Sequence, residues 1–155
     1  MKRKICATLT GLLAAVLLAS CGADPALSRF KTDMDKFCNN VAEINDAINA
    51  IDVGDENAPT LALEYLDRLD KEFQNFAEMD FPEDYDYLEP LADEAGSYMA
   101  EAVKSYHQAY ADGGYDKSTA DYARENSARA FKRVQVILDI LHGEMPDNAE
   151  ESAQN

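Results

Sequence analysis

Two histidines are the residues of this chain best suited to metal or acid–base chemistry. A di-iron site in a helical bundle uses two Glu-x-x-His motifs together with carboxylates from the other helices. Neither His107 nor His142 follows a glutamate at that spacing, and Asp139 with His142 forms a single Asp-x-x-His pair. A histidine near a helix C-terminus is stabilised by the helix dipole, which is the simpler interpretation of this pair. The pattern therefore predicts no di-metal site.

Haem binding is a second possibility, because methionine and histidine can together ligate an iron. Met34 and His142 are predicted to lie on neighbouring helices, but at different heights. Met34 lies about nine residues, or ~13 Å, from the start of its helix, whereas His142 lies within a turn of the end of its own. The chain has no Cys-x-x-Cys-His motif for covalent haem attachment. No cofactor is expected.

The other catalytic patterns are also incomplete. The acidic segment 52–57 lacks the alternating oxygen ligands and the closing glutamate of a calcium loop. Ser105 and His107 would point to different faces of one helix, which does not suit a serine triad. No catalytic and no metal-ligating residue is therefore assigned, and the chain is predicted not to be an enzyme.

A different kind of chemistry is indicated at Cys21. The segment 1–4 carries three positive charges, and the uncharged run 5–18 is too short to span a ~30 Å hydrocarbon core, which is typical of a signal peptide. The tetrapeptide Leu18-Ala19-Ser20-Cys21 resembles the lipobox of bacterial lipoproteins. In that family an apolar residue and two small residues precede the cysteine, and the lipoprotein signal peptidase cleaves before it.

The resemblance implies that residues 1–20 are removed and that Cys21 becomes the acylated first residue of the mature chain. Two or three acyl chains are enough for stable membrane anchoring. The expected location is the extracytoplasmic face of the cell membrane, or the outer membrane if the cell has one, since Gly22 is not the Asp that resembles an inner-membrane retention signal. An ordinary thiol after conventional cleavage is the alternative.

The mature chain would be small and strongly acidic. Removal of residues 1–20 leaves 135 residues, enough for one domain, with 11 basic and 30 acidic side chains and a net charge of −19. Such a surface repels nucleic acid and anionic lipid, and it could attract cationic partners or simply be solvated. Cys38 is the one thiol left, so no internal disulfide is expected. It suits a small apolar core filler, with an intermolecular disulfide or redox role as the alternative.

Aromatic side chains between residues 90 and 112 are the candidate partner-binding residues. Tyr98, Tyr106, His107 and Tyr110 make this segment amphipathic and could suit a partner protein or a glycan. The alternative is that the rings fill a helical bundle and keep their hydroxyls at its rim. A basic group on the next segment more simply pairs with acidic neighbours than forms a ligand site; it comprises Arg124, Arg129, Lys132 and Arg133.

Four segments have helical periodicity and would position these residues. The first begins at Asp24-Pro25 and ends at Gly54, with an apolar residue at alternating spacings of three and four. These residues are Leu27, Phe30, Met34, Phe37, Val41, Ile44, Ile48 and Ile51. The second helix is predicted to begin near Asn57 or Ala58, with Ala62, Leu66, Leu69, Phe73 and Phe76 on its apolar face.

Residues 80–89 are predicted to form a connector that could include one helical turn. The third helix is predicted to start near Pro90 and to end at Gly113-Gly114. The fourth is predicted to open near Asp116 or Ser118, where Ser118-Thr119-Ala120-Asp121 matches a capping box, and to end at Gly143.

Helices of similar length with short links predict an all-α, antiparallel up-down four-helix bundle over residues 21–143. A three-helix bundle with a peripheral helix is the alternative. Residues 144–155 are predicted to be an acidic, disordered tail. The expected function is that of a non-enzymatic interaction module of the bacterial cell envelope, with an envelope protein as a possible partner. The alternative is a carrier of a small ligand, metal or haem that uses the bundle interior.

Overall fold

The structure is a computed structural model that describes residues 25–111 and 114–143. The predicted signal peptide 1–20, the lipid site Cys21, the glycine at position 113 and the acidic tail 144–155 lie outside the described residues.

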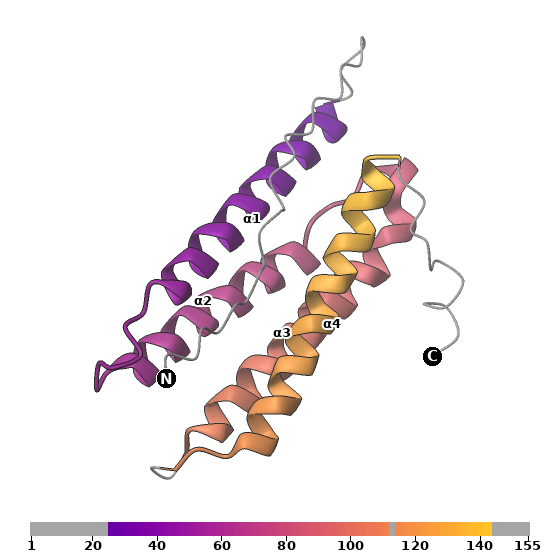
Figure 1. Cartoon of the computed structure of the whole chain (residues 1–155). Coiled ribbons are helices and arrows are strands. Elements are labelled where there is room, and N and C mark those ends of the chain that lie inside the picture. Colours follow the sequence, from indigo (N-terminus) through magenta and orange to yellow (C-terminus); the bar gives the residue numbers. More distant parts are fainter. Residues whose placement is uncertain (1–24, 112–113, 144–155) are drawn as a thin grey trace.

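The described part of the chain is an all-α four-helix bundle, as predicted (Figure 1). The helices α1 and α2 form one antiparallel hairpin, and α3 and α4 form a second. A short 3-10 helix, η1, joins the two hairpins. The bounds are α1 Pro25–Asn49, α2 Ala58–Ala77, η1 Glu83–Leu88, α3 Glu89–Ala109 and α4 Lys117–Leu141.

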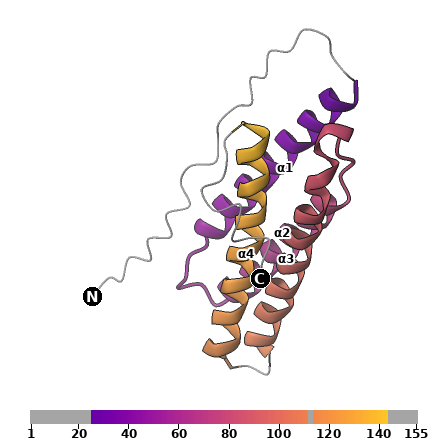
Figure 2. The ribbon, with the colours of Figure 1, turned by 90° about the vertical axis from the view of Figure 1, so that its right-hand side faces the viewer.

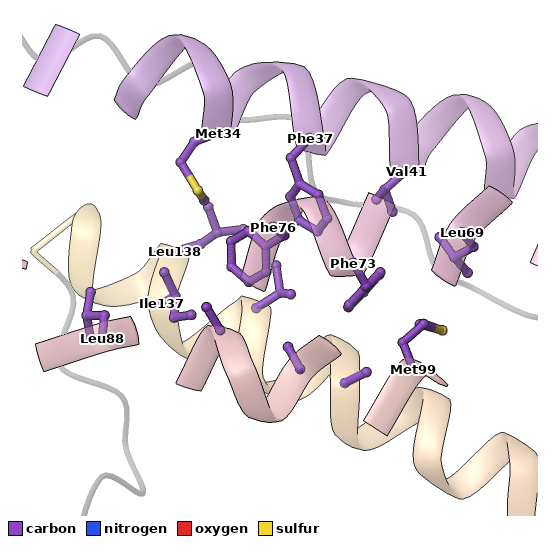
Figure 3. Close-up of a cluster of buried hydrophobic side chains, with 14 of the residues drawn as sticks. Met34, Phe37, Val41, Leu69, Phe73, Phe76, Leu88, Met99, Ile137 and Leu138 are labelled. Carbon is purple, nitrogen blue, oxygen red and sulfur yellow. The ribbon is translucent and has the colours of Figure 1, made fainter. Parts of the chain in front are cut away.

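Phenylalanine rings pack α1 against α2 within the first hairpin and also join this hairpin to the second. Phe37 of α1 stacks on Phe76 of α2 with ring centroids 4.5 Å apart, and it meets Phe73 edge-on at 5.4 Å. Phe73 in turn meets Phe131 of α4 edge-on at 5.3 Å. Figure 3 shows side chains of α1 pointing into the space between α1 and the other helices. Because Phe73 and Phe76 are fully buried, α2 is an integral helix of the bundle rather than a peripheral one.

The second hairpin packs through small side chains. Six alanines on the facing sides of α3 and α4 are at most 2% exposed, and short side chains let two helices approach closely. They are Ala95, Ala102 and Ala109 of α3 and Ala120, Ala123 and Ala130 of α4. The contact between α3 and α4 is the most extensive between any two helices of the described chain.

The four predicted helix starts agree with the structure to within a residue or two, whereas the ends of α1 and α3 differ from the prediction. The starts of α1 and α2 and the end of α4 before Gly143, which has φ 76°, are as expected. The first helix ends at Asn49 rather than at Gly54, and the third ends at Ala109 before the two glycines. Of the two predicted starts of α4, Asp116 is confirmed, because its carboxylate accepts the backbone N–H of Thr119 at 3.0 Å, and the capping box at Ser118 is wrong.

No described helix has a stretch both long and apolar enough to cross a membrane.

Candidate interaction site

The structure separates the four candidate partner-binding residues into three environments. Tyr98 lies against α4, where the guanidinium carbons of Arg129 and Arg133 are 5.8 and 5.9 Å from its ring centroid. The Nε of Arg133 donates to Oε2 of Glu94 at 2.5 Å. Tyr98 therefore belongs to a contact that holds α3 against α4, and at Arg133 the predicted pairing with an acidic neighbour is confirmed.

His107 faces the other neighbouring helix. Its Nε2 is 2.6 Å from Oδ1 of Asp67 on α2, and both side chains are about half exposed. This pairing directs the imidazole toward α2. His107 and its sequence neighbour Tyr106 therefore do not belong to the same surface.

Tyr106 and Tyr110 do come together, and a third ring joins them. Tyr106 and Tyr110 lie one turn apart at the end of α3, where the backbone N–H of Tyr110 donates to the carbonyl oxygen of Tyr106 at 3.3 Å. The rings of Tyr110 and Tyr115 have centroids 5.2 Å apart, and these two side chains are 39% and 55% exposed. We call Tyr106, Tyr110 and Tyr115 the distal tyrosine patch. Tyr115 was not among the predicted residues, because it lies in the turn between α3 and α4, outside any helical periodicity.

The phenol of Tyr106 is shielded from solvent by this packing. Burial raises the pKa of Tyr106 above the usual tyrosine value, and the nearby Tyr115 and Tyr110 add to the increase. The charge of Arg124 and the hydrogen bond with Ser127 act in the opposite direction. Tyr106 is therefore the partly buried member of the patch, while Tyr110 and Tyr115 offer the accessible surface.

The patch lies at the end of the bundle remote from the start of α1. Figures 1 and 2 place the first turn of α1 and the turn between α3 and α4 at opposite ends. Phe30 in α1 contacts Phe81 with ring centroids 4.8 Å apart, which fixes the connector and the start of α3 at the α1 end. The 21 residues of α3 then carry the chain about 30 Å away from that end.

Charges near the patch are paired within single helices. Lys104 lies 3.3 Å from Glu101 on α3, and on α4 both Lys117 and Arg124 contact Asp121. These pairs neutralise part of the acidic charge around the rings. Accessible aromatic rings are enriched at protein interfaces, where acidic residues are depleted, so partial neutralisation of the nearby acidic charge favours such a role.

The remaining candidate groups lie elsewhere. Cys38 packs against the hydrophobic core, and burial, with a smaller contribution from Asp35, raises the pKa of its thiol. Met34 is buried on α1, whereas His142 is exposed after the last residue of α4. Within the described residues, no group of three or more histidine, cysteine or acidic side chains is arranged to hold a metal ion.

Comparison of the chain with protein-family models, with curated proteins and with solved structures finds no match.

Proposed function

We propose that this chain is a bacterial lipoprotein, anchored through Cys21 on the extracytoplasmic face of a membrane, whose helical bundle binds another protein of the cell envelope. The observation that carries the proposal is the position of the distal tyrosine patch. The first helix begins four residues after Cys21, so acyl chains on that cysteine would hold the α1 end of the bundle close to the membrane. The patch would then face away from the membrane.

The chemistry of the patch favours a protein partner. Tyrosine contributes a large contact area for little loss of conformational entropy, and it is enriched among the residues that dominate binding energy. The rest of the surface is strongly acidic, which disfavours nucleic acid and anionic lipid as partners. An envelope protein that buries Tyr110 and Tyr115 would meet rings close to the ion pairs that Lys117 and Arg124 form with Asp121.

Photo-crosslinking in intact cells tests the interaction. A photo-reactive p-benzoylphenylalanine replaces Tyr115 in the patch or, as the matched control, Tyr87 of η1. The two tyrosines are 55% and 59% exposed, but they lie at opposite ends of the bundle. We expect a discrete crosslinked protein from position 115 and none from position 87. Equal crosslinking from both positions, or none from position 115, contradicts the proposed interaction.

The alternative of a carrier that uses the bundle interior has no support in the packing. The centre of the described bundle is filled by fully buried side chains from α2, α3 and α4, among them Phe73, Phe76, Met99 and Ile137. A cleft lined by residues of α1, α2 and the segment before η1 opens on the surface instead.

A further inference from the structure

A cleft of about 550 Å³ opens between α1, the end of α2 and the segment that leads into η1. This volume lies within the range of small-molecule binding sites. Met79, which is partly exposed, supplies accessible apolar surface, and beneath it lie four core phenylalanines that are at most 8% exposed, namely Phe30, Phe37, Phe76 and Phe81. The site is therefore a concave surface with a rigid base, because the residues under it are held by packing.

The two sides of the cleft carry charges of opposite sign. The α1 side has the cations Arg29 and Lys36, with Asp33 between them in the sequence. The other side has three carboxylates, those of Glu72, Glu78 and Asp80. In the described part of the chain no ion pair joins the two sides, since every ion pair found there involves other residues.

We propose that this cleft binds a short zwitterionic peptide that carries an apolar side chain. The peptide carboxylate would lie toward Arg29 and Lys36, and its ammonium group toward Glu78 and Asp80. The apolar side chain would pack on Met79, whose flexible thioether adapts to different shapes. The site does not depend on the proposed membrane anchor or on the distal tyrosine patch.

The pattern of charge and shape favours this class of ligand over simpler ones. A purely anionic or purely cationic ligand would be attracted by one side of the cleft and repelled by the other. A zwitterion satisfies both sides, and its zero net charge avoids repulsion from the acidic chain. The partly exposed thioether of Met79 offers apolar contact to a group between the two charges, and a peptide side chain supplies such a group, whereas a lipid headgroup does not.

Methyl NMR of the purified full chain, with ¹³C-labelled methionine, tests the proposal directly. The probe is the dipeptide leucyl-leucine, and its uncharged control is the same dipeptide with an acetylated N-terminus and an amidated C-terminus. We expect leucyl-leucine to shift the Met79 methyl signal saturably and to leave that of the buried Met99 unchanged. The proposal is overturned if Met79 does not respond, or if the blocked dipeptide shifts it equally.

A third probe separates the peptide from a lipid headgroup. Glycerophosphoethanolamine has the same two charges without an apolar side chain, so we expect it to bind more weakly than leucyl-leucine. If it binds as tightly or more tightly, the cleft is a headgroup site and the peptide assignment is wrong.

Charge variants locate the binding site. We expect Lys36→Gln and Asp80→Asn each to weaken leucyl-leucine binding about fivefold, the effect of losing one partly solvated charge contact. The matched controls are Lys132→Gln and Glu64→Gln, which remove exposed charges outside the cleft and should leave the affinity unchanged. Circular dichroism verifies that each variant is folded. Wild-type affinity in both cleft variants contradicts the proposal.

Discussion

Phe76 shows how much of the bundle depends on single rings. Its side chain has no exposed surface, stacks on Phe37 and contacts Phe81 with centroids 6.4 Å apart. We expect Phe76→Ala to lower the free energy of unfolding by about 3–5 kcal/mol, because it removes buried contacts and leaves a cavity. Urea unfolding followed by circular dichroism measures this change. The control Tyr87→Ala removes a ring that is mostly exposed and should change the free energy by about 0.5 kcal/mol or less.

Ionisation of Tyr106 should lower the stability of the bundle at alkaline pH. Its pKa is raised in the folded protein, so the neutral phenol is favoured by folding. The stabilisation is therefore complete below the ordinary tyrosine pKa of about 10 and is lost as the pH rises through the raised value. We expect the wild type to lose more stability than Tyr106→Phe between pH 8 and pH 11. Parallel curves for the two proteins in urea unfolding would contradict this assignment.

At the scale of the elements, the sequence leaves open whether Asp116 or Ser118 is the N-cap of α4, and the structure assigns Asp116. The carboxylate of Asp116 accepts the Thr119 N–H, whereas Ser118 lies inside the helix. We expect Asp116→Ala to cost about 1 kcal/mol of unfolding free energy. Ser118→Ala should leave stability nearly unchanged. A larger loss from Ser118→Ala than from Asp116→Ala, measured by urea unfolding, would restore the capping box that the structure rejects.

Gly96 sets the distance between α2 and α3. A Cβ at this position would lie 3.0 Å from the Cβ of Ala77 and 3.4 Å from the carbonyl oxygen of Phe73. We expect Gly96→Val to lower the unfolding free energy by about 1–3 kcal/mol through overpacking. Ser97→Val, on the exposed face of the same helix, is the control.

A second substitution tests whether the contact with Ala77 is the cause. Adding Ala77→Gly to Gly96→Val removes the nearest atom and should recover part of the lost stability. If the double variant is no more stable than expected from the sum of the two single losses, the clash with Ala77 is not the origin of the effect.

The periodicity of α1 was sufficient to predict its buried face. Phe30, Met34, Phe37, Val41 and Ile44 are all buried, because one apolar stripe at spacings of three and four can face only one core. The connector was also predicted, since acidic residues and Pro82 interrupt the pattern between α2 and α3. Both predictions rest on local chemistry that needs no knowledge of neighbouring helices.

The burial of α3 could not be predicted in the same way. This helix lies between α2 and α4, so it buries two sides, and small residues such as Gly96 and Ser105 become inaccessible while Tyr98 and Tyr106 stay partly exposed. The sequence shows which residues are apolar but not how closely two helices approach. For the same reason the contact of Tyr110 with Tyr115 was missed, since it depends on the path of a turn.

At the scale of the whole molecule, the bundle has two chemically different ends. The α1 end holds the connector and the cleft, and the opposite end holds the distal tyrosine patch. Under the proposed function, acylated Cys21 would orient this axis so that the patch faces away from the membrane. The orientation and the partner interaction both depend on that one modification.

Intact mass spectrometry of the protein purified from cell membranes tests the anchor most directly. We predict a mature chain that begins at Cys21 and carries a diacylglyceryl group, and a Cys21→Ala variant that is neither processed nor acylated. A chain recovered from the soluble fraction with residues 1–20 attached, or with an unmodified Cys21 thiol, would contradict the proposed anchoring.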